Sequence, residues 1–170
     1  MAMFDVGTKN RSRFRNGCLV ALLALVADQV TKQFVLTFPQ RFAEGIPVFP
    51  GFNLVLGMNS GVSFGMLGSM PWWGLSLFGL AIVVGMFVWM WREDSRLATL
   101  GIGLIIGGAL GNIIDRARHG AVVDFLDFWI GTYHWPTFNV ADIAIVSGVV
   151  GTLSAEVLRG RSSTRSQDIG

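Results

Sequence analysis

Four long apolar stretches constrain the fold of this chain more than any other feature. Residues 18–38, 72–91, 97–114 and 138–158 are each 18 to 21 residues long and carry few or no charges. A helix rises 1.5 Å per residue, so about 20 apolar residues cross a hydrocarbon core of about 30 Å. Hydrophobic residues make up 52% of the 170 residues and charged residues only 14%. The sequence therefore predicts an all-α integral membrane protein with four transmembrane helices, forming a single membrane domain over residues 1–170.

The basic residues predict the orientation of these spans. Four spans leave both termini on one side, and the cytoplasmic side of a membrane protein usually has the excess of Lys and Arg. One side holds nine of the 13 basic residues: Lys9, Arg11, Arg13, Arg15, Arg92, Arg96, Arg159, Arg161 and Arg165. We therefore expect both termini in the cytoplasm. The tail over 160–170 is rich in Ser and Arg and is expected to be disordered.

The loop between the first two spans, residues 39–71, is long enough to fold on the outer face. Within it, Phe52, Leu54 and Leu56 alternate with less apolar or smaller residues. This alternation is typical of a half-buried strand. We expect a small sheet that lies on the membrane.

Small residues recur in the last two spans at helical spacing. Gly103, Gly107 and Gly111 follow one another at intervals of four, and Gly148 and Gly151 occur in the last span. Such residues let membrane helices approach closely. We expect the last two spans to pack against each other, with their outer ends together.

Two carboxylates, Asp124 and Asp142, lie at these outer ends. Asp142 is four residues into the last span, about 6 Å along a helix, and Asp124 follows the third span by ten residues in the apolar run VVDF. Carboxylates in a poorly hydrated site do not both ionise readily, so one keeps a proton while the other can accept one from water. The sequence predicts a catalytic pair able to cleave a peptide bond, without saying which carboxylate is the base.

Other roles compete for each carboxylate. Asp142 could cap its helix, but Asn139 is the better cap by residue type and position. Asp124 could be a solvated loop carboxylate. Asp127 is a rival for the catalytic role, although its apolar neighbours favour an anchor at the membrane interface.

Further polar residues are placed to support the pair. Asp28 and Lys32 are four residues apart on the first span, and Asn112, Asp115 and Arg116 share one face of the third. They could simply neutralise charge at the membrane boundary. They could also hold the loop after the third span and offer Arg116 as a donor to substrate carbonyls. Both readings are open at this point.

Five short motifs resemble those of a known family in order and spacing. The chain from 18 to 158 resembles the lipoprotein signal peptidases, which are the type-II signal peptidases and membrane aspartic peptidases of bacteria. The motifs are DQVTK from Asp28, NSGVSFG from Asn59, GGALGNIIDR from Gly107, VVDF from Val122 and FNVAD from Phe138.

The resemblance implies a fold, an activity and a set of site residues. The fold has four helices, a periplasmic sheet cradle and a short outer helix between the last two spans. The activity removes the signal peptide of a prolipoprotein just before a cysteine that carries diacylglycerol, at the outer face of the bacterial inner membrane. Asp124 and Asp142 match the catalytic aspartates, and Asp28 and Lys32 match the first-helix motif. The positions that match the family's substrate pocket are Asn59, Gly61, Gly108, Asn112, Arg116 and Asn139.

We expect no cofactor, no nucleic-acid partner and a monomer that meets prolipoprotein and membrane lipid. His119 and His134 lack metal-ligand spacing, so we expect no metal. A small proton-coupled transporter is the main alternative, since intramembrane acids also relay protons. Against it, the hydropathy has no obvious inverted repeat and the acids gather at one membrane face. A third hypothesis, a scaffold stabilised by its aspartates, predicts that Asn substitutions leave activity intact.

Overall fold

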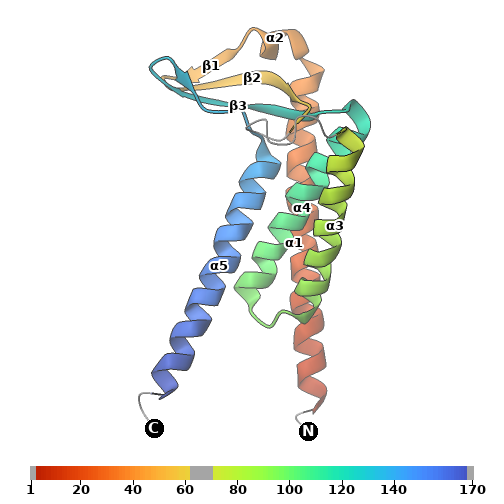
Figure 1. Ribbon diagram of the computed structural model, residues 1–170, viewed down its shortest axis with the longest axis vertical. Coiled ribbons are helices and arrows are strands. Elements are labelled where there is room, and N and C mark those ends of the chain that lie inside the picture. The colour runs from red at the N-terminus through yellow and green to blue at the C-terminus, as the bar shows by residue number, and fades with distance from the viewer. Residues whose placement is uncertain (1–2, 62–70, 168–170) are drawn as a thin grey trace.

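Four long helices run side by side, with a small sheet across one end and both chain termini at the other (Figure 1). The structure, a computed structural model, describes residues 3–61 and 71–167, and the side chains of 11–61 and 71–160. The helices are α1 (Met3–Thr37), α2 (Pro39–Ala43), α3 (Trp72–Arg92), α4 (Arg96–His119) and α5 (Val140–Gln167), and the strands are β1 (Ile46–Phe49), β2 (Phe52–Asn59), β3 (Val122–Ile130) and β4 (Tyr133–His134).

Four helical segments of the described chain are long and apolar enough to cross a membrane. They are Arg11–Thr37, Trp72–Arg92, Arg96–His119 and Val140–Gly160. Their outward faces carry large apolar side chains, such as Leu23, Phe78 and Val146, that a water-soluble protein would bury. The predicted architecture of four spans and a small sheet is confirmed, and the protein is a multi-pass membrane protein.

Helix α4 is the central helix of the bundle, and its glycines allow the close packing. A β-carbon at Gly107 would overlap the carbonyl oxygen of Ala21 on α1, and one at Gly108 would overlap that of Ala141 on α5. Gly101 of α4 likewise packs against Gly148 of α5. The last two spans therefore do pack closely, as predicted. The stripe of glycines that predicted this contact, however, faces α1.

The ends of three helices opposite the sheet meet at one buried carboxylate, Glu93, in the turn between α3 and α4. It accepts hydrogen bonds from the backbone N–H of Ser95 at 2.7 Å and from the Trp89 indole at 3.2 Å. It also forms an ion pair with Arg159 of α5. This ion pair joins α5 to the α3–α4 turn at the end of the molecule opposite the sheet.

The sheet is antiparallel, with strand order β1-β2-β3-β4. In its central pair, Leu54 lies opposite Leu126 but Gly57 lies opposite Asp124, so β2 advances three residues while β3 advances two. This is a β-bulge with its extra residue in β2. Because side chains alternate between faces, the extra residue reverses the face to which every later residue of β2 points.

Two expectations differ from the structure. The short outer helix between the last two spans is wrong, because that segment forms β3 and β4. The segment VVDFLDFWI is rich in β-branched and aromatic residues, which favour strands, and it pairs with β2, which also extends the sheet beyond the 39–71 loop. At the end opposite the sheet, α5 continues to Gln167, where the sequence predicted a disordered tail from Gly160. Residues 62–65 of the second motif lie outside the described chain.

Candidate active site

The two predicted carboxylates meet where the sheet joins the bundle. Asp124 lies on β3 between Val123 and Phe125, which are buried against Val35 and Phe42. Since side chains alternate along a strand, this packing turns Asp124 to the opposite face of the sheet.

Asp142 lies in the first turn of α5 and forms a reciprocal cap with Asn139. The Asn139 Oδ1 accepts a hydrogen bond from the Asp142 backbone N–H at 3.0 Å, and the Asp142 Oδ2 accepts one from the Asn139 backbone N–H at 3.3 Å. This is the arrangement of a capping box. Asn139 is the helix cap, as predicted, and the exchange fixes the orientation of the Asp142 carboxylate.

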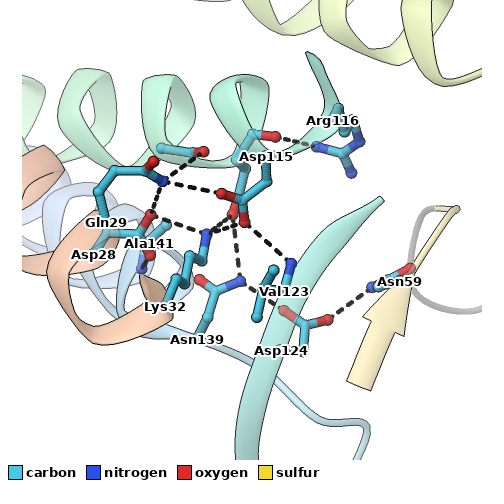
Figure 2. Close-up of polar contacts among 12 residues, drawn as sticks. Asp28, Gln29, Lys32, Asn59, Asp115, Arg116, Val123, Asp124, Asn139 and Ala141 are labelled. Carbon is cyan, nitrogen blue, oxygen red and sulfur yellow. Dashed lines mark hydrogen bonds and ion pairs between the residues drawn. The ribbon is translucent and has the colours of Figure 1, made fainter. Parts of the chain in front are cut away.

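Amide groups occupy all four oxygens of the pair. Asn139 Nδ2 donates to Asp124 Oδ1 at 2.6 Å, and Asn59 Nδ2 donates to Asp124 Oδ2 at 3.0 Å (Figure 2). Asn112 Nδ2 donates to Asp142 Oδ1 at 3.0 Å. Because Asn139 bonds to both carboxylates, it holds β3 and α5 at a fixed separation.

The setting of Asp124 favours its protonated form. The side chain is 2% exposed, and burial raises the pKa of Asp124 to about 6, with a further upward contribution from the charge of Asp142. The hydrogen bonds from Asn59 and Asn139 and the positive charge of Lys32 oppose this shift without cancelling it. Asp124 therefore keeps a proton to a higher pH than an ordinary aspartate.

A buried ionic cluster made of Asp28, Lys32 and Asp115 lies behind the pair. The Lys32 Nζ is 2.9 Å from Asp28 Oδ2 and 2.8 Å from Asp115 Oδ2. Gln29 donates to both carboxylates, at 3.2 and 3.0 Å (Figure 2). The Lys32 side chain is 2% exposed, so its positive charge is paired with carboxylates inside the protein and not with water.

A cavity of about 530 Å³ opens in front of the pair. It continues along α5 past Ile143, Val146 and Ser147. The predicted residues that line it are Asn59, Gly61, Asn112, Arg116, Asp124 and Asp142.

Several lining residues escaped the sequence analysis. Val146 is one helical turn beyond Asp142, so helical spacing could have indicated it. The segment 135–138, which also lines the cavity, gave no comparable signal, because only the fold brings it to the site.

Three of the predicted or rival residues are not among the residues that line the cavity. Gly108 and Asn139 do not line the cavity: Gly108 lets α4 approach α5, and Asn139 is fully buried between the carboxylates. Asp127 is 4% exposed and bonds to Asn53 and His134 on the other face of the sheet. It is not part of the pair, and its burial does not fit an interfacial anchor.

Comparison with known proteins shows the family of the chain. A family model described as signal peptidase (SPase) II matches residues 20–158. The chain belongs to the signal peptidase II family. This confirms the resemblance and the enzyme class predicted from the motifs, because members of the family are aspartic peptidases that cleave signal peptides from prolipoproteins.

Relatives and solved structures extend over most of the chain. The lipoprotein signal peptidase of Nitrobacter hamburgensis is 44% identical over 154 residues, 85% of this chain and 93% of its own. That of Methylorubrum extorquens is 43% identical over 166 residues, 92% of this chain and 93% of its own. A bacterial membrane enzyme determined by the in meso method at 2.3 Å resolution has a TM-score of 0.73 and 30% identity, covering 86% of this chain and 90% of its own. The family match and these similarities thus extend over both the bundle and the sheet of this chain.

Proposed function

We propose that this protein removes signal peptides from diacylglyceryl-modified prolipoproteins, cutting before the lipidated cysteine, with Asp124 and Asp142 as the catalytic pair. The observation that carries the proposal is that two carboxylates, bonded by neutral amides, face one cavity at the end of a membrane bundle. Membership of the signal peptidase II family supports the substrate class.

The chemistry needs one ionised and one protonated carboxyl. The ionised group takes a proton from water, the resulting hydroxide attacks the scissile carbonyl carbon, and the protonated group donates its proton to the carbonyl oxygen. The tetrahedral intermediate then collapses, and a proton passes to the leaving amine. The raised pKa of Asp124 supports a shared proton near neutral pH. The two groups titrate as a unit, so neither alone is named the base.

Arg116 is a donor available to the substrate. Its Nη1 and Nη2 bond weakly, at 3.4 Å, to the backbone oxygens of Asn112 and Gly61. Its Nε is buried at the cavity without a partner within the described chain. A substrate carbonyl would satisfy this N–H, because a buried donor is costly to leave unpaired.

The cavity suits a substrate that stays in the bilayer. It continues from the carboxylates along the apolar side chains Ile143 and Val146, which are 46% and 63% exposed. A signal helix and acyl chains can therefore approach sideways through lipid. We further propose a monomer in the bacterial inner membrane, with cytoplasmic termini and the site near the outer face.

Cleavage by the purified protein in lipid vesicles tests the proposal. The substrate is a diacylglyceryl prolipoprotein, and the wild type is compared with Asp142→Asn and with the control Asp94→Asn, whose carboxylate is exposed at the inner end. We expect Asp142→Asn to lower turnover by a factor of roughly 10³, because an amide cannot transfer the proton, and the control to cut normally. Near-normal turnover by folded Asp142→Asn would exclude the pair.

The lipid requirement needs its own comparison. An unlipidated precursor should be cut with a far higher KM, because the acyl chains contribute binding energy and position the cysteine. Equal kcat/KM for the two precursors would reject the lipidated substrate while leaving the peptidase activity standing.

A further inference from the structure

Lys32 contacts Asp28, Asn112 and Asp115 but does not itself line the cavity of the candidate active site. We infer that Lys32 is a positioning residue, which fixes the orientation of the Asn112 amide and thereby the hydrogen bond that Asp142 receives. The inference rests on the proposed function, in which Asp142 is one of the catalytic pair. It assigns to a lysine in the first span a role in chemistry carried out by β3 and α5.

Lys32 acts first on the side-chain amide of Asn112. Lys32 Nζ donates to Asn112 Oδ1 at 2.9 Å, and Asn139 Nδ2 donates to the same oxygen at 3.3 Å. An ammonium group has donors only, so it must face the amide oxygen. The amide nitrogen is then left for Asp142 Oδ1, at 3.0 Å. Without the ammonium, the Asn112 oxygen keeps only the longer hydrogen bond from Asn139, so the amide is held less firmly against Asp142.

The second step is the backbone beside each catalytic candidate. Asp28 Oδ1 accepts a hydrogen bond from the Ala141 backbone N–H at 2.9 Å, and Asp115 Oδ2 accepts one from the Val123 backbone N–H at 3.0 Å (Figure 2). Lys32 holds both of these carboxylates. Ala141 precedes Asp142 and Val123 precedes Asp124, so the same cation steadies the main chain next to both members of the pair.

The third step is charge. The charged groups around Lys32 come from every element packed there: Asp28 on α1, Asp115 and Arg116 on α4, Asp124 on β3 and Asp142 on α5. The positive charge of Lys32 lowers the pKa of Asp124 against the effect of burial. Its removal therefore lets Asp124 keep its proton to a still higher pH.

The test compares Lys32→Met with Arg159→Met. Methionine keeps an unbranched apolar stem and removes the ammonium. The control also takes a cation from a buried carboxylate, Glu93, but at the inner end of the bundle. We expect Lys32→Met to lower kcat by roughly a hundredfold with KM within about threefold, since small displacements of reacting groups are costly, and to move the pH–rate profile to higher pH. Arg159→Met should lower Tm and leave the profile in place.

A measurement without substrate separates this inference from the proposed function. Infrared titration follows the protonated carboxyl band that Asp124→Asn removes. In Lys32→Met this band should persist to a higher pH than in the wild type. A folded Lys32→Met with an unmoved band and an unmoved profile would overturn the positioning role. If the single variant does not fold, Lys32→Met combined with Asp28→Asn removes the ion pair without changing net charge, and the same infrared shift decides the matter.

Discussion

Two carboxylates on one strand, Asp124 and Asp127, have similar surroundings and different partners. Both lie on β3 and are nearly fully buried, at 2% and 4% exposure. Each accepts a hydrogen bond from an asparagine of β2: Asn59 donates to Asp124 at 3.0 Å and Asn53 donates to Asp127 at 3.1 Å. Burial and an amide partner are therefore common to both.

The difference lies in what else each one meets. They are three positions apart along the strand, an odd number, so they point to opposite faces of the sheet. Asp127 meets the half-exposed ring of His134 at 2.8 Å. Asp124 faces a cavity that it shares with a second carboxylate, Asp142. Under the proposed function, a second acid and room for a substrate, more than burial, distinguish the catalytic carboxylate Asp124 from the structural carboxylate Asp127.

The largest effect on turnover should appear when Asp124 and Asp127 are neutralised one at a time. We expect Asp124→Asn to lower turnover by roughly 10³ and Asp127→Asn to change it by less than about threefold. Initial rates on a lipidated precursor measure both, and circular dichroism checks the fold of each variant. Equal losses of turnover in the two variants would contradict the distinction between a catalytic Asp124 and a structural Asp127.

A smaller effect should follow from moving Asp142 while leaving both carboxylates of β3 intact. Gly108→Ala places a methyl group where the Ala141 carbonyl lies, which pushes α5 from α4. A displacement near 1 Å can cost about a hundredfold in rate, so we expect a loss of about that size in kcat. The control is Gly85→Ala, because a β-carbon there meets no atom of the described residues within 4 Å. Normal turnover by Gly108→Ala would show that the site tolerates the shift.

The titration of Asp124 should also appear in stability. Its pKa in the folded protein is about 6, above the ordinary 3.8, so ionising it costs folding free energy as pH rises from 4 to 6, and that cost is constant at higher pH. Asp124→Asn removes the cost. We expect the variant to gain, relative to the wild type, up to about 3 kcal/mol between pH 4 and pH 8. Tm values of the wild type and of Asp124→Asn, measured in detergent at pH 4 and pH 8, test this expectation. A Tm difference between the two proteins that is the same at both pH values would contradict it.

The smallest effect should come from His134, the partner of the structural carboxylate. His134→Ala leaves Asp127 with the Asn53 amide and removes a half-exposed contact. We expect a loss of about 1 kcal/mol in the free energy of unfolding and a change in turnover of less than about twofold. A large fall in turnover of His134→Ala with little change in Tm would indicate that Asp127 belongs to the active site.

Local patterns were enough to predict much of this molecule. The apolar stretches predicted the spans, the alternation near Phe52 predicted β2, and residue type and position predicted Asn139 as the cap of α5. The carboxylates were found because charge beside a membrane span is costly unless it has a role.

Contacts between distant segments could not be predicted in this way. The strand that carries Asp124 pairs with β2, more than 60 residues earlier, and an outer helix was expected in its place. The glycine stripe predicted a close helix contact but not its partner, since Gly107 packs against α1. Gln29, which bonds to both carboxylates of the ionic cluster, lay inside a matched motif without any signal of its own.

The β-bulge between Leu54 and Gly57 makes chain length matter more than residue identity in this part of β2. Deleting one residue there would leave the Asn53–Asp127 pair in place but turn Asn59 away from Asp124. Many substitutions within the bulge leave Asn59 on the face of Asp124. The gain or loss of a single residue there moves Asn59 to the opposite face. Natural insertions and deletions among functional relatives should therefore avoid this short stretch and collect in the connections on either side.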